Sequence, residues 1–206
     1  MRRVDDAGML LCALAMTVIL GCSATRHVNL LYGPNAAVRP EASAAAGIAH
    51  VAVAIFIDAR DTDERGNRFL GSIRTIYGRP STAVYAMQDP VIWVSEGIAR
   101  GLATHGYKVD RVTSSRTAGD LPTITGKVTR VVSGMYMNVE AHVDAELQFE
   151  QPAHEPIAVH CTGETLKSAG AASSSLYEDV FLETMTRFLD DCVPKLAAII
   201  DSRSGE

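Results

Sequence analysis

Two cysteines, Cys161 and Cys192, are the first candidates for chemistry in this chain. Thiols can pair in a disulfide, bind a metal or act as nucleophiles. A metal site is not expected, because the two residues are 31 positions apart and neither belongs to a Cys-x-x-Cys motif. Cys161 falls in a predicted strand and Cys192 in a predicted helix, so a disulfide would join the two across the core. Two buried free thiols, packed as small hydrophobic groups, are the alternative.

The six histidines and the serines form no known catalytic or metal-binding motif. The chain lacks His-Glu-x-x-His, Gly-x-Ser-x-Gly and Ser-x-x-Lys. His142 and His160 would approach a common zinc ion only if their strands paired side by side. We therefore expect no catalytic residue, no metal and no cofactor, and we do not expect an enzyme.

A charged segment follows the predicted buried strand over residues 50–57, with Asp58, Arg60, Asp61, Asp63, Glu64 and Arg65. Calcium is not expected, because a loop counted from Asp61 has Ser72 at its twelfth position, where a Glu is required. A solvated loop with internal ion pairs is one interpretation. In a second, Asp58 caps turn amides and Arg60 pairs with a carboxylate. In a third, Asp58 and Arg60 bind a partner, because loops at sheet ends often carry function.

Three apolar side chains, Met135, Tyr136 and Met137, stand at a predicted hairpin tip. One interpretation buries them against the C-terminal helix. The other leaves them exposed as a contact for a partner or a lipid chain.

The N-terminal segment predicts export. Arg2 and Arg3 precede an apolar run over residues 9–20, and Gly21 and Cys22 follow it. A basic start, about 12 apolar residues and a small residue at the end are typical of a secretory signal. A permanent transmembrane helix is not expected, since about 18 apolar residues would be needed.

The residues Ile19, Leu20, Gly21 and Cys22 resemble the lipobox of bacterial lipoproteins. The resemblance implies removal of residues 1–21, acylation of Cys22 with fatty acids such as palmitate, and attachment of the mature protein to a membrane by these chains. Ser23 stands where an Asp would favour the inner membrane, so we expect the periplasmic face of the outer membrane. A signal peptide without acylation is the alternative. This compartment is oxidising, which permits pairing of Cys161 and Cys192.

Composition indicates one globular domain behind a tether. Hydrophobic residues make up 47% of the chain, which is enough for a core. The net charge is −5, and no cluster of Lys and Arg follows the signal, so nucleic acid is not an expected partner. Residues 22–47 are rich in Ala and Pro and predict a flexible tether with a reach of about 25–30 Å, of which residues 27–32 could dock as a short strand. Residues 48–202 form the predicted domain.

The elements predicted within this domain give an α+β fold, a mixed or antiparallel sheet with two main helices on one face. Asp89 and Pro90 begin a helix that stops at Gly106, and Gly97 and Gly101 allow another element to approach it closely. A capping box at Ser175 begins the last helix, which Pro194 should kink or divide. The predicted strands cover residues 50–57, 72–77, 82–87, 107–112, 124–132, 136–149 and 157–166, with a turn at Ser133 and Gly134.

The order of several motifs resembles the YajG-like bacterial lipoproteins and, more distantly, the auxiliary lipoproteins of ABC-type lipid transport systems. The motifs are the lipobox, Asp58-Ala59-Arg60, Leu70-Gly71, Tyr77-Gly78, the helix start at Asp89 and the segment from His105 to Val109. The resemblance implies a compact α/β sandwich on an outer-membrane lipid anchor and brings no catalytic residues.

Three functions remain open on the sequence. The first is a non-enzymatic binding module that contacts an envelope protein or a second copy of itself. The second is an accessory lipoprotein of an ABC-type lipid transporter, which predicts an apolar groove between helices and sheet. The third is an envelope hydrolase, which predicts a concave site with a nucleophile beside a base.

Overall fold

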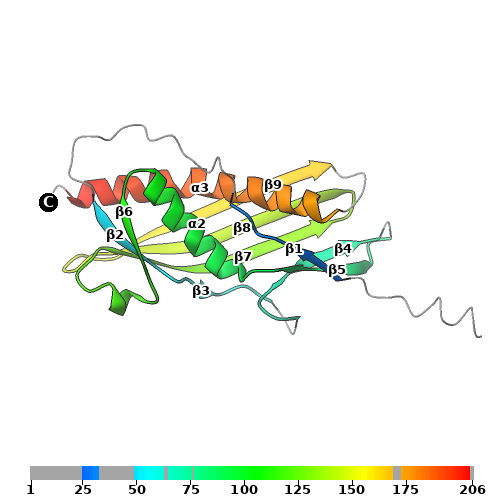
Figure 1. Ribbon diagram of the computed structural model, residues 1–206, viewed down its shortest axis with the longest axis horizontal. Helices are drawn as coiled ribbons and strands as arrows, with labels where there is room; N and C mark the ends of the chain where they lie inside the picture. The colour runs from blue at the N-terminus through cyan, green and yellow to red at the C-terminus, as the bar shows by residue number, and fades with distance from the viewer. Residues whose placement is uncertain (1–24, 33–48, 63–64, 76, 169–172, 205–206) are drawn as a thin grey trace, which may run out of the picture.

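The computed structural model describes residues 25–32, 49–62, 65–75, 77–168 and 173–204. In this part of the chain a curled mixed sheet of nine strands is covered by two helices (Figure 1), an α+β fold as predicted. The strands are β1 (Thr25–Val28), β2 (His50–Ala54), β3 (Ile57–Asp58), β4 (Phe69–Arg74), β5 (Pro80–Ala86), β6 (Lys108–Val112), β7 (Thr123–Met135), β8 (Asn138–Glu150) and β9 (Ile157–Ser168). The helices are α2 (Pro90–Thr104) and α3 (Ser174–Ser204), with a 3₁₀ turn at Ser115–Thr117. None of the described helices has the length and apolar character needed to cross a bilayer.

Strand β7 is the centre of the sheet. One edge of β7 pairs with β8, and β8 pairs with β9, all antiparallel. The other edge is shared by three parallel partners: β2 and β3 lie near its start and β4 lies at its end. Strand β6 extends the sheet beyond β2, and β5 and β1 extend it beyond β4. The sheet therefore consists of three long strands, β7, β8 and β9, with short strands added beside the start of β7 and beside its end.

The long strands have one apolar and one polar face. Along β8 the side chains from Val139 to Phe149 alternate between buried and more exposed, as predicted for a half-solvated antiparallel strand. The turn between β7 and β8 lies at Tyr136 and Met137, however, and the predicted turn residues Ser133 and Gly134 belong to β7. Ser133 is held in the strand because its hydroxyl donates to the Glu140 carbonyl oxygen at 2.7 Å.

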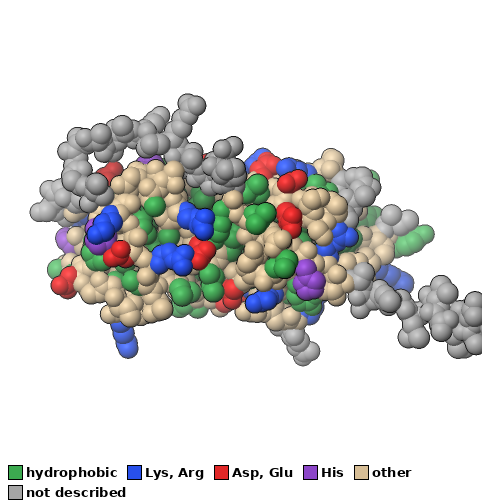
Figure 2. All heavy atoms as spheres, viewed as in Figure 1, with side chains coloured by type: hydrophobic (Ala, Val, Ile, Leu, Met, Phe, Trp, Pro, Cys, Tyr) green, Lys and Arg blue, Asp and Glu red, His purple; other side chains and the backbone are tan. Residues whose placement is uncertain are grey.

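Both helices pack on the apolar face, and two glycines bring them together. A Cβ atom built on Gly97 would lie 2.8 Å from Met185 Sδ, and one on Gly101 would lie 2.7 Å from Val193 Cγ2. The predicted close approach at these glycines is confirmed, with α3 as the partner. Asp89 is the N-cap of α2, as predicted, and accepts from the Val91 amide at 2.8 Å. The surface over the helices carries interspersed acidic and basic side chains (Figure 2).

Helix α3 differs from the prediction at its N-terminal end. Its N-terminal cap is Ser173, whose hydroxyl accepts from the Leu176 amide at 3.1 Å, and not Ser175. Glu178, the other half of the predicted capping box, instead accepts from the Asn29 amide at 3.2 Å. Pro194 does not divide the helix, which is continuous over Ser174–Ser204.

A third glycine brings α3 against the backbone of β9. A Cβ atom on Gly163 would lie 2.5 Å from the Thr184 carbonyl oxygen and 2.7 Å from the Phe188 amide nitrogen. Beside this contact, Asp191 accepts from the Thr162 amide at 3.2 Å, and Lys195 donates to the His160 carbonyl oxygen at 3.0 Å. Two backbone groups on the free edge of β9 are therefore bonded to α3, which hinders pairing of this part of the edge with another chain.

Cys161 and Cys192 join β9 to α3 in a disulfide. Their Cα atoms are 5.2 Å apart, and both residues are fully buried. The bridge closes a 31-residue separation in the sequence, so it limits the freedom of the unfolded chain over that length.

The N-terminal segment 25–32 is part of the fold. Strand β1 runs parallel to β5, with Thr25 opposite Ala83. Leu30 is buried, and the Tyr32 hydroxyl donates to the Trp93 carbonyl oxygen at 2.6 Å. The docked strand lies slightly earlier than the predicted 27–32, and this part of the predicted tether is held on the domain. Residues 33–48 lie outside the described residues.

The contact at Gly163 generates a stability prediction. We expect Gly163→Ala to lower the free energy of unfolding by about 2–3 kcal/mol, because the added methyl group meets backbone atoms that cannot move aside. Gly97→Ala is the matched control. Its methyl group meets the flexible end of Met185, and alanine favours the helix by about 1 kcal/mol, so the two effects nearly cancel. Urea denaturation of both variants measures the difference, and equal losses would contradict the assigned packing.

The disulfide generates a second prediction. Replacing both cysteines (Cys161→Ala with Cys192→Ala) should lower the free energy of unfolding by about 3–4 kcal/mol, the loop-closure effect for this separation. Denaturation of the wild-type protein with and without reductant is the accompanying measurement. An unfolding midpoint that does not respond to reductant would show that the thiols are not paired.

Candidate functional site

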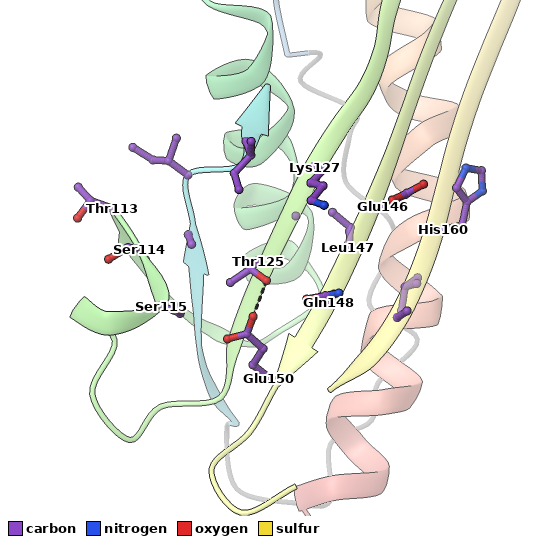
Figure 3. Close-up of a pocket in the computed structure, with 16 residues that line it drawn as sticks. Thr113, Ser114, Ser115, Thr125, Lys127, Glu146, Leu147, Gln148, Glu150 and His160 are labelled. Atoms are coloured by element: carbon purple, nitrogen blue, oxygen red, sulfur yellow. Dashed lines mark hydrogen bonds between the residues drawn. The ribbon is translucent and has the colours of Figure 1, made fainter. Parts of the chain in front are cut away.

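A trough lies on the face of the sheet that the helices leave uncovered. It has a volume of about 690 Å³ and runs over the first part of β7, the end of β8 and the start of β9 (Figure 3). Volumes of about 300–1,000 Å³ are usual for ligand-binding pockets. The trough is therefore large enough to bind a ligand or a segment of another protein.

The floor of the trough is polar. It is formed by outward-facing side chains of the three long strands, namely Thr125, Lys127, Glu146, Gln148, Glu150 and His160, together with Ala158. Thr125 donates its hydroxyl hydrogen to Glu150 at 2.8 Å (Figure 3), and the register places Lys127 opposite Glu146. The floor presents both donors and acceptors of hydrogen bonds.

The wall of the trough is apolar on one side. Ile55 and Ile57 are 48% and 62% exposed, whereas Phe56 between them is buried. Gly126 accommodates this arrangement, because a Cβ atom there would lie 3.2 Å from the Phe56 ring. The prediction of a wholly buried strand over residues 50–57 is therefore wrong for these two isoleucines. An all-apolar run gives no periodic signal that could distinguish the inward from the outward residues.

The segment after β6 continues this same side of the wall, because the Ile55 amide donates to the Val112 carbonyl oxygen at 3.1 Å. Thr113, Ser114 and Ser115 line it with small polar side chains. His160 lies across the trough from these serines (Figure 3), so the lining residues do not place this imidazole beside either hydroxyl. Among the described lining residues, His160 is therefore not placed to activate Ser114 or Ser115 as a nucleophile.

Asp58 and Arg60 pair with each other beside a second, smaller cavity of about 250 Å³. The Arg60 guanidinium donates to both Asp58 carboxylate oxygens, at 2.9 and 2.7 Å, and the Arg60 amide donates to Asp58 at 3.1 Å. The Arg60 side chain is only 3% exposed. Partial burial alone would raise the pKa of Asp58, but the hydrogen bonds and charge of Arg60 outweigh this effect and hold the pKa below its usual value. This geometry matches the interpretation in which Asp58 caps a turn amide and Arg60 pairs with a carboxylate.

The β7–β8 hairpin exposes two of the three residues singled out at its tip. Tyr136 and Met137 are 53% and 72% exposed, and Met135 is partly buried against the core. The interpretation that buries all three against the C-terminal helix is wrong for Tyr136 and Met137, because they form the turn itself and extend past the end of the sheet. They lie at the opposite end of β7 from the trough.

The histidines considered for zinc are not brought together. The register pairs His142 with Glu164 and His160 with Glu146, so the two rings are four positions apart along the strands. Among the described residues, no group of three or more His, Cys, Asp or Glu side chains is arranged to hold a metal ion. The acylation candidate Cys22 lies outside the described residues.

No protein-family model and no curated protein sequence matches this chain. Among solved structures, protein XCC0632 from Xanthomonas campestris, of the family DUF330, is similar with a TM-score of 0.56 and 14% identity, over 88% of this chain and 98% of that chain. A protein described only as uncharacterized is similar with a TM-score of 0.52 and 8% identity, over 84% and 99% of the two chains. These likenesses show a shared fold. Lipoprotein GNA1162 from Neisseria meningitidis has a TM-score of 0.34 and 10% identity, over 77% and 99%, which is too low to support an argument.

The Asp58–Arg60 pair generates a pH-dependent prediction. Asp58→Asn should lower the free energy of unfolding at pH 7 by about 1 kcal/mol, because it weakens two charge-assisted hydrogen bonds at the partly exposed end of β3. The pKa of Asp58 is lower in the folded state, so its contribution is present above about pH 4 and is lost as the carboxylate protonates at lower pH. Denaturation at pH 7 and pH 3 measures this, and a wild-type advantage that persists undiminished at pH 3 would contradict the role of the charge.

Proposed function

We propose that this protein is a lipid-anchored, non-enzymatic binding module of the bacterial envelope, and that its trough binds an extended segment of a partner protein. The trough on the uncovered sheet face is the observation that carries the binding role. Its exposed isoleucines supply an apolar contact, and its polar floor supplies hydrogen-bond partners for a peptide backbone. An acyl chain would leave these polar groups unpaired, so a protein segment is the better occupant.

The anchoring part of the proposal comes from the sequence. The basic residues, the apolar run and the lipobox-like end at Cys22 support export, acylation and attachment by acyl chains. Assignment to the YajG-like lipoproteins and location at the periplasmic face of the outer membrane belong to the same proposal. The fold shared with a DUF330 protein is compatible with it but does not separate the YajG-like lipoproteins from other families.

The other two functions are less well supported. An accessory role in lipid transport predicts an apolar groove between helices and sheet, but Trp93, Phe181 and Phe188 occupy this space and are buried. The two larger described cavities, of about 690 and 250 Å³, lie on the opposite face of the sheet, and the described cavity beside α2 measures only about 50 Å³. A hydrolase usually uses a serine or cysteine activated by a histidine, and in the trough His160 lies across from Ser114 and Ser115 rather than beside them.

The anchor is tested by one substitution. Cys22→Ala should move the protein from the membrane fraction to the soluble periplasmic fraction, since the described domain has no spanning helix. Ser23→Ala, which leaves the thiol in place, is the matched control and should stay with membranes. Sedimentation of the Cys22→Ala protein with membranes would contradict the anchor.

The binding role is tested by photo-crosslinking in cells. A benzoylphenylalanine at position 57 should form an adduct with an envelope protein, whereas the same group at position 92 should not. Ile92 is the matched control because it is also an exposed isoleucine, at 43%, but lies on α2. Adding Ile55→Asp should reduce the adduct at position 57 about tenfold or more, since burying an isoleucine contributes about 1.5–3 kcal/mol.

Three results would contradict the assigned occupant: equal adducts at positions 57 and 92, adducts with lipid alone, or no adduct at position 57. Ile55→Asp should not unfold the protein, because this side chain is already half exposed. Circular dichroism of the purified variant checks that the fold is retained.

A further inference from the structure

Two hairpin tips with exposed apolar side chains lie at the same end of the sheet. Tyr77 stands in the β4–β5 hairpin and is 83% exposed, and Tyr136 and Met137 form the β7–β8 turn. Strands β4 and β7 are parallel, with Ile73 opposite Met135, so both hairpins extend past the sheet in the same direction. The two hairpins lie at the right-hand end of the molecule in Figure 1. We call Tyr77, Tyr136 and Met137 the hairpin pole.

Strand β1 begins near this same end of the sheet. Strand β1 is parallel to β5, and Thr25 pairs with Ala83, three residues after β5 begins at Pro80 beside the β4–β5 hairpin. Only two residues separate Cys22 from Thr25, so covalent geometry limits their Cα atoms to about 11 Å apart. The 13 residues of β7 extend over about 40 Å, so Cys22 cannot reach the far end of the sheet.

The charge near the hairpin pole suits a membrane surface. Arg74 and Arg79 flank Tyr77 and are exposed, and residues 72–87 contain no acidic residue although the whole chain has a net charge of −5. Hydrophobic and basic side chains project together at the right-hand end in Figure 2. Tyrosine places its apolar ring and polar hydroxyl at the level of lipid headgroups, and arginines nearby interact with lipid phosphates.

We infer that the hairpin pole contacts the surface of the membrane that holds the acylated Cys22, and so orients the domain with β7 pointing towards the lipid. This inference rests on the proposed lipid anchor. The trough residue Thr125 lies 11 positions from Tyr136 along β7, so the trough opens about 35 Å from the lipid surface. At that distance the trough is accessible to proteins of the periplasmic space.

The orientation is tested with the acylated full chain in vesicles of phosphatidylethanolamine and phosphatidylglycerol. Met137→Trp places a fluorescent reporter at the hairpin pole, and Asp120→Trp places one in the exposed segment before β7, at the other end of the sheet. The native Trp93 is buried and gives the same background in both proteins. Lipids with brominated acyl chains quench only indoles that reach the bilayer.

We expect brominated lipid to reduce the fluorescence of Met137→Trp and to leave that of Asp120→Trp at the Trp93 background. Adding Tyr77→Asp to Met137→Trp should reduce the quenching, because it removes the contact of the neighbouring hairpin. The inference is overturned if both variants float with the vesicles and Met137→Trp is not quenched, which would indicate a free tip or one that binds a protein. Equal quenching of the two variants overturns it as well. Failure of the acylated chain to float overturns the anchor itself, which is a distinguishable result.

Discussion

The fold depends on how closely α3 approaches the sheet. Gly163 has no side chain, so the α3 backbone near Thr184 and Phe188 lies directly against β9. The same approach brings Cys192 to Cys161 and lets Asp191 and Lys195 bond to the Thr162 amide and the His160 carbonyl oxygen on the free edge of β9. On its other side α3 contacts α2 through Gly97 and Gly101. Both helices are therefore held on one face of the sheet, and the other face is left open.

The proposed binding site and the proposed membrane contact lie at opposite ends of β7. The trough lies where β7 begins, under the wall made by Ile55 and Ile57. The hairpin pole lies where β7 ends, and β1 brings the N-terminal segment to that end. A rigid strand of 13 residues thus separates the proposed binding site from the proposed membrane contact. In the proposed arrangement, the docking of β1 leaves two residues between Cys22 and the domain, which would keep the domain close to the lipid surface.

The sequence predicts the parts of this structure that are governed by local rules. Asp89 caps α2, the β8 alternation separates its faces, and the glycine spacing in α2 indicates a close neighbour. The parallel pairing of β7 with β2, β3 and β4 could not be predicted, because parallel partners are not joined by a short turn with its own signal. For the same reason the trough was not predicted. Its wall is exposed only because β2 and β3 meet β7 in this register.

The most direct test of a lipid-anchored binding module is the intact mass of the native protein purified from membranes. The account predicts a chain that begins at Cys22 and carries the added mass of fatty acyl chains on that residue. A chain that retains residues 1–21, or one that begins at Cys22 without added acyl mass, would contradict it.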